Sequence, residues 1–165
     1  MSGHVPVDYA RRHLRLGWWW LLTFSALGLA LEGLHGFKVA AYLDVSNETR
    51  RLMWRLAHVH GALVGVVHIL FGLTAKVMGE AAIARIRSIS LALQAAGVLL
   101  PAGFFLGGVA IYSGDPGLSV LLVPIGAVLL LFALLLLATA SGSGDSDPAG
   151  PQSPAEPRKD IPRKR

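Results

Sequence analysis

Five side chains able to bind metals or carry protons lie inside two long apolar stretches of the sequence. They are Glu32 and His35 in the first stretch and His58, His60 and His68 in the second. A charged residue at the centre of a membrane helix costs about 2.5–3.5 kcal/mol on insertion scales, so such residues are usually functional. Neutral imidazole is also the common protein ligand of haem iron, copper and zinc. These five are the candidate functional residues.

Their spacing predicts one polar face on each of two helices. Glu32 and His35 stand three residues apart and share one side of a helix, while His58 and His68 share one side of the next. Folding the two helices about the loop between them places His58 level with His35. We expect His60 to project away from this face, toward another helix or the membrane interface. His68 is expected deeper, nearer the middle of the membrane.

The favoured interpretation is a bound haem or transition-metal ion with a redox or respiratory-type role. His35 and His58 would ligate haem b from two helices, with Glu32 orienting an imidazole and His68 as a further candidate ligand. Glu32, His35, His58 and His60 could instead hold Cu, Fe or Zn near the outer face. The helix count and the buried histidines resemble four-helix b-type cytochromes in architecture, without a shared motif.

Two other classes of function stay open. In the first, the His and Glu residues hydrogen-bond across helices and fix the packing of a non-catalytic or assembly subunit of a membrane complex. In the second, Glu32, His35, His58 and His68 form a proton or ion relay, for which an imidazole with an ordinary pKa near 6.5 is suited. Few polar residues continue such a path to the inner face.

Several enzyme classes are excluded by what the sequence lacks. A di-iron carboxylate site needs several Glu residues and two Glu-x-x-His motifs, whereas Glu32 is the one Glu within the apolar stretches. Cysteine is absent, so there is no disulfide, thiolate metal site or Cys nucleophile. Zinc-protease spacing, a P-loop and a Ser-His-Asp arrangement are missing as well. No enzymatic activity is assigned.

Four apolar segments must position these residues. With a mean hydropathy of +0.56 and 53% hydrophobic residues, this chain of 165 residues is too apolar for a soluble domain. A run of about 20 apolar residues spans the roughly 30 Å hydrocarbon layer. We therefore predict an all-α integral membrane four-helix bundle, residues 17–140, built from two antiparallel transmembrane hairpins. Its helices are expected at about residues 17–42, 52–77, 89–112 and 118–140.

The flanking segments indicate topology and partners. Residues 1–16 form a basic N-terminal segment, and residues 141–165 a disordered, basic Pro/Gly/Ser-rich tail. With both termini inside, eleven of the fifteen Lys and Arg residues lie on the inner side, five of them in the tail. The bias to Ala, Gly, Leu, Arg and Pro with little Lys favours a bacterial inner membrane. Expected partners are the lipid bilayer and a partner subunit or second copy, not nucleic acid.

Overall fold

A computed structural model describes residues 7–44, 46 and 48–141 of the chain. Its elements are α1 (Tyr9–Gly36), α2 (Ala40–Leu43), α3 (Glu48–Met78), η2 (Glu80–Ala82), α4 (Ile86–Gly107), β1 (Ile111–Tyr112), β2 (Asp115–Pro116), η3 (Leu118–Leu121) and α5 (Leu122–Ser141). Four helical segments are long and apolar enough to cross a membrane: α1, α3, α4 and η3 with α5. This confirms the predicted all-α architecture of four such helices. Residues 1–6 of the basic segment and the predicted disordered tail from residue 142 onward lie outside the described residues.

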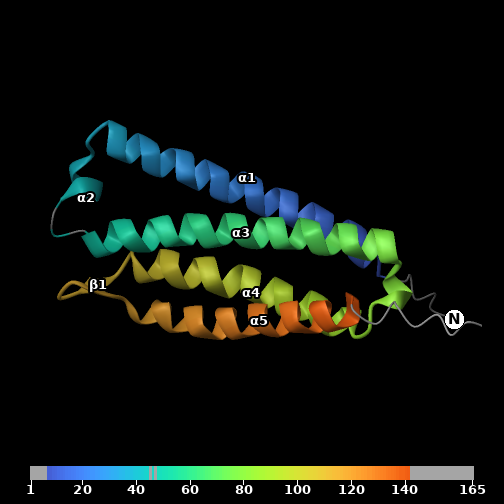
Figure 1. Ribbon diagram of the computed structural model, residues 1–165. Helices are drawn as coiled ribbons and strands as arrows, with labels where there is room; N and C mark the ends of the chain where they lie inside the picture. The colour runs from blue at the N-terminus through green and yellow to red at the C-terminus, as the bar shows by residue number, and fades with distance from the viewer. Residues whose placement is uncertain (1–6, 45, 47, 142–165) are drawn as a thin grey trace, which may run out of the picture.

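The four long helices run antiparallel in chain order (Figure 1). Each packs chiefly against its neighbours in the sequence, α1 on α3, α3 on α4 and α4 on α5. As a result α1 and α5 lie at opposite edges. We call the end where α1 begins and α3 gives way to α4 the N-terminal end. The end that carries α2 and the β1–β2 hairpin is the hairpin end.

The first long helix begins earlier than the apolar run predicts. It was expected from about Gly17, but α1 starts at Tyr9 because Asp8 caps it, its carboxylate accepting a hydrogen bond from the backbone N–H of Arg11 at 2.7 Å. A second free N–H of this first turn, that of Ala10, donates to the Glu80 carboxylate of η2 at 2.8 Å. Much of the predicted basic N-terminal segment is therefore the first two turns of a helix.

The same helix also ends earlier than predicted. Instead of continuing to residue 42, α1 stops at Gly36, and Lys38 adopts a left-handed backbone with φ 53°. The chain then turns into the short helix α2, whose last carbonyl, on Leu43, accepts a hydrogen bond from the Arg51 guanidinium of α3 at 2.8 Å. This break allows α2 to fold back toward α3 at the hairpin end.

The connection between the third and fourth predicted helices, near residues 112–117, is a β-hairpin with a two-residue loop. Ile111 pairs with Pro116 and Tyr112 with Asp115. The two loop residues have positive φ angles, 51° at Ser113 and 92° at Gly114. Two positive φ angles in a two-residue loop are typical of a type I′ turn, whose twist matches that of the strands. Consequently α4 ends at Gly107, before the predicted residue 112.

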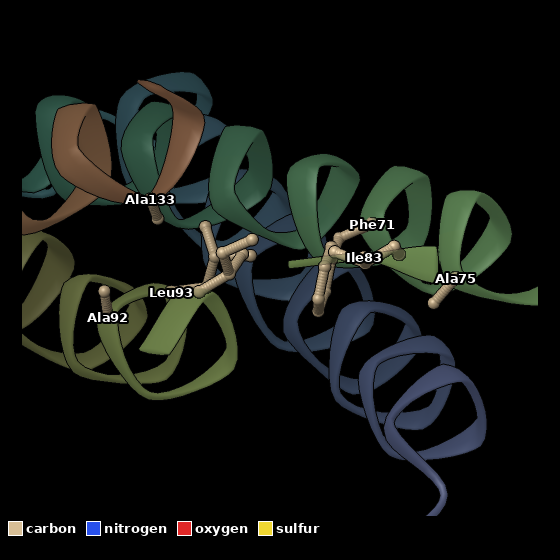
Figure 2. Packing of buried hydrophobic residues seen from close by; sticks show 7 residues of the cluster. Phe71, Ala75, Ile83, Ala92, Leu93 and Ala133 are labelled. Carbon is tan, nitrogen blue, oxygen red and sulfur yellow. The ribbon is translucent and has the colours of Figure 1, made fainter. Parts of the chain in front are cut away.

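The apolar core lies where α3, α4 and α5 meet near the N-terminal end (Figure 2). Phe71 of α3 and Leu93 of α4 are almost fully buried there, and Ala133 brings α5 close. On the other side of α3, α1 approaches at a glycine contact: a Cβ on Gly17 would lie 2.7 Å from the Gly65 carbonyl oxygen. Small residues at such contacts let membrane helices pack backbone to backbone. The core therefore holds α3 in place, and the polar sites described below lie along this helix.

Candidate functional site

A cleft of about 860 Å³ opens between α1 and α3 at the hairpin end. Three of the predicted site residues line it, namely Glu32 and His35 from α1 and His58 from α3. Two cations that sequence reasoning did not include, Arg51 and Arg55 of α3, line it too. Its remaining walls are mostly apolar. The folded chain thus brings one carboxylate, two imidazoles and two guanidinium groups to one cleft.

The orientation of the His58 ring is set by α1. Its Nδ1 lies 2.6 Å from the backbone carbonyl oxygen of Phe24. A carbonyl can only accept, so Nδ1 carries a proton and donates, and in the neutral ring Nε2 has a free lone pair. The ring reaches this position because residue 28 is glycine: a Cβ there would lie 2.4 Å from Cε1 of His58. Nε2 makes no hydrogen bond with any residue that the structure describes, and is therefore available as a ligand atom.

Glu32 and His35 complete the predicted polar face of α1. Both are exposed along the cleft, and neither side chain makes a hydrogen bond or ion pair within the described part of the chain. No three His, Asp or Glu residues among those described are placed to share one metal ion. Within these residues the predicted set of Glu32, His35, His58 and His60 is therefore not gathered around a single point.

His60 lies outside the cleft. Its Nδ1 is 2.9 Å from the Leu56 carbonyl one turn earlier in α3, and its ring packs at a tilt against Phe104 of α4, with centroids 4.7 Å apart. A ring that is hydrogen-bonded to its own helix and packed against a neighbouring helix has a packing role. The structure thus separates His60 from the three residues that line the cleft.

The two arginines differ in how they are held. Arg51 donates to the Leu43 carbonyl and approaches Glu48 at 3.5 Å, so it is partly committed to holding α2. Arg55 lies one turn further along α3 and is exposed, with no hydrogen bond or ion pair to another described residue. With one carboxylate, Glu32, against two guanidinium groups, the cleft carries an excess of positive charge.

His68 belongs to a second polar cluster, at the N-terminal end. It is fully buried, and its Nδ1 lies 2.7 Å from Nδ1 of His13 on α1. Nε2 of His13 lies 2.8 Å from the Ser90 hydroxyl of α4, so this one imidazole connects three helices. Its own ring is fully buried and meets Phe71 edge-on at 4.6 Å.

Sequence reasoning missed His13 because it precedes the apolar run. The signal was nevertheless present, since His13 lies on the same helical face as Gly17, Phe24 and Gly28, all buried in α1. Extending the helical period upstream of the apolar residues would have placed it beside α3.

A chain of hydrogen bonds links the buried pair to the surface. Arg12 donates to Oε1 of Gln94 at 2.6 Å, and Nε2 of Gln94 donates to the Ser90 hydroxyl at 2.9 Å. From Ser90 the chain continues to His13 and ends at His68. The far atom of the chain, Nε2 of His68, has no hydrogen-bond partner among the described residues. This series of hydrogen bonds therefore begins at the surface, at Arg12, and ends in the core, at His68.

An apolar layer separates the two clusters. His58 and His68 are ten residues apart on α3, about 15 Å along the helix axis. Between them the Phe24 ring lies directly on Gly61, where a Cβ would approach it to 2.3 Å, and buried Val64 fills the next turn. A relay from the cleft to His68 would have to cross this layer.

No protein-family model, curated protein sequence or solved structure matches the chain. Its class is therefore defined by its own geometry. It is a four-helix protein apolar enough to span a membrane, with a polar cleft at one end and a buried histidine network at the other.

Proposed function

We propose that this is a haem-binding membrane protein, with haem b held in the cleft between α1 and α3 and ligated by Nε2 of His58. The observation that carries the proposal is the hydrogen bond from Nδ1 of His58 to the Phe24 carbonyl. Histidines that ligate metals nearly always donate their other ring N–H to a carbonyl or carboxylate, which fixes the tautomer and the ring. His58 has this arrangement and lines the cleft of about 860 Å³.

Haem fits the described residues better than a bare metal ion does. A structural or catalytic ion such as zinc takes three or four protein ligands, and the described residues offer no group of three. The macrocycle supplies four of the ligands to haem iron, so the protein needs to add only one or two. His35, on the opposite wall, is the candidate for the second. The cleft volume falls within the roughly 300–1,000 Å³ of cofactor-sized pockets.

The charges of the cleft suit the two carboxylates of haem. Arg51 and Arg55 lie on its α3 wall, and a guanidinium group pairs well with a propionate through two parallel hydrogen bonds. Arg55 has no other described partner, so we assign it the larger part of this contact. Glu32 stands one helical turn from His35 and would accept a hydrogen bond from its ring, raising its basicity as a ligand.

The membrane placement forms part of the proposal. The start of α1 and the end of α5 would both lie on the cytoplasmic side of a bacterial inner membrane, because six of the ten described Lys and Arg residues are at that end. The cleft then opens toward the outer face. A haem at this depth would serve electron transfer with a partner outside the membrane or within a larger complex.

The test is an absorption spectrum of the full chain, purified in detergent from cells supplied with a haem precursor, oxidised and then reduced with dithionite. We expect a Soret band that shifts on reduction. His58→Ala should abolish it, and addition of free imidazole to that variant should restore part of it. His60→Ala is the matched control, because the same residue type is removed two positions along the same helix, and it should keep the band.

A wild-type protein that elutes as a single folded species without a Soret band would exclude the haem proposal. The second candidate is then a non-catalytic subunit whose polar residues fix helix packing, which the His13–His68–Ser90 contacts favour because they join three helices. That function predicts a partner protein that co-purifies with the chain. A proton relay has less support, because the apolar layer at Phe24 interrupts its path.

A further inference from the structure

Two adjoining hollows run along the outer side of α1 at the N-terminal end, with volumes of about 340 and 310 Å³. Arg11, Arg15 and Trp19 line both, so they form one groove. The end nearer the start of the helix also includes Asp8, Arg12, Leu16 and Gln94, and the other end includes Leu14, Trp18 and Leu22. We call this the Arg–Trp groove. It is separate from the cleft at the hairpin end.

The chemistry of the Arg–Trp groove changes in order along the helix. Arg11 and Arg15 are one turn apart, Trp18 and Trp19 follow on the next turn, and Leu22 on the one after. At 1.5 Å per residue the sequence from cation to indole to aliphatic chain covers about 16 Å. A phospholipid has the same order, from its phosphate through its glycerol esters to its acyl chain. Trp prefers the interfacial depth between the two.

The cations of this groove are only partly neutralised. Asp8 forms an ion pair with Arg11 at 3.5 Å and also caps the helix. Arg15 has no carboxylate within ion-pair distance among the described residues, and Arg12 contacts only the neutral amide of Gln94. Among the described residues, the charges of Arg12 and Arg15 are therefore not paired with a carboxylate and can attract an anion. Trp18 and Trp19 remain 63% and 64% exposed, so no described part of the chain covers the apolar end.

We propose that the Arg–Trp groove binds an anionic phospholipid, with the phosphodiester against Arg12 and Arg15 and one acyl chain along Trp18, Trp19 and Leu22. Charge complementarity selects the anionic head group, and the apolar continuation of the groove selects a lipid over a soluble phosphate. In the orientation proposed above, this end faces the cytoplasmic leaflet, where anionic lipids are found. The inference does not depend on haem and rests on different residues.

The first arm of the test measures lipid binding to the full chain by native mass spectrometry in a neutral detergent. Phosphatidylglycerol and phosphatidylcholine are titrated against wild type, Arg12→Gln/Arg15→Gln and the control Lys76→Gln/Arg87→Gln. The control removes the same charge from the same end but outside the groove. Each groove arginine should contribute about fivefold in affinity, so the groove variant should bind phosphatidylglycerol about 25-fold more weakly. Equal losses in both variants would overturn the proposal.

The second arm separates a lipid from a free phosphate. Trp19→Ala should weaken phosphatidylglycerol binding, and millimolar inorganic phosphate should displace little of the lipid. If phosphate alone displaces the lipid and Trp19→Ala has no effect, the groove is an anion site and not a lipid site. All substituted side chains are exposed. Far-UV circular dichroism should therefore show unchanged helix content. If the groove variant loses both its helix content and its lipid binding, the result would count against the proposal.

Discussion

The Nδ1 atoms of His13 and His68 lie 2.7 Å apart, so a hydrogen bond between the two rings connects α1 to α3 inside the protein. One ring must donate and the other accept, which requires at least one neutral imidazole with a defined tautomer. If His13 donates, its Nε2 accepts from the Ser90 hydroxyl, and the N–H of His68 is on its Nε2, buried in the core. The stability of this end of the protein therefore depends on both histidines together.

Removing one member of this pair should cost more than removing both. His13→Leu leaves Nδ1 of His68 buried without its partner, so we expect the free energy of unfolding to fall by about 1–3 kcal/mol. In His13→Leu/His68→Leu the buried polar pair is replaced by apolar side chains, and much of that loss should be recovered. Unfolding in mixed detergent and SDS micelles measures both values. A double variant that loses as much free energy of unfolding as His13→Leu, or more, would contradict the coupling.

Gly28 should control the cofactor site through His58. In Gly28→Ala the new Cβ would lie 2.4 Å from Cε1 of His58, so the ring must leave the Phe24 carbonyl. We expect a loss of about 1–3 kcal/mol in the free energy of unfolding from overpacking, and a weaker Soret band. Gly33→Ala is the matched control on the same helix, because a Cβ there meets nothing within 4 Å. It should raise stability by up to about 1 kcal/mol. Equal behaviour of the two variants would argue against the role of Gly28.

The turn between β1 and β2 offers a stabilising substitution. Ser113 holds a left-handed backbone with φ 51°, which costs an ordinary L residue roughly 1–2 kcal/mol. Asn tolerates this conformation and is the preferred first residue of a type I′ turn before glycine. Ser113→Asn should therefore raise the free energy of unfolding by about 0.5–1 kcal/mol. Gly114→Ala, at φ 92°, should lower it. Thermal unfolding in detergent compares the two, and no difference between them would refute the argument.

Asp44, in the segment between α2 and α3, should titrate at unusually low pH. The backbone N–H of Ser46 donates to its carboxylate at 3.0 Å and is the main reason that the pKa of Asp44 lies below its ordinary value, with the Ser46 hydroxyl and Arg51 also lowering it. The folded state thus favours the charged form. Its stabilising contribution is present above the unfolded pKa of about 3.9 and is lost as the pH falls through the folded pKa.

The measurement is an NMR titration of the Asp44 carboxyl carbon. Ser46→Ala keeps the N–H and should raise the pKa only in part, whereas Ser46→Pro removes the donor and should raise it further. A pKa that is the same in all three proteins would show that Ser46 does not hold the carboxylate.

The architecture and part of the candidate site were predictable from local sequence. Apolar runs long enough to span a hydrocarbon layer determine the four helices, because in such runs only helical backbone satisfies its own hydrogen bonds. The three-residue spacing of Glu32 and His35 determines their common side of α1. The hairpin connection then places His58 opposite them. These inferences need only the helical period and the length of a loop.

The pairing of the remaining residues was decided by tertiary contacts. His13 meets His68 because Asp8 and the distant Glu80 begin α1 eight residues before its apolar run. His58 points as it does because Gly28 leaves room for its ring beside the Phe24 carbonyl. A sequence period says which residues share a face. Which neighbour each face meets, and at what height, depends on helix ends and close approaches set by residues far away in the chain.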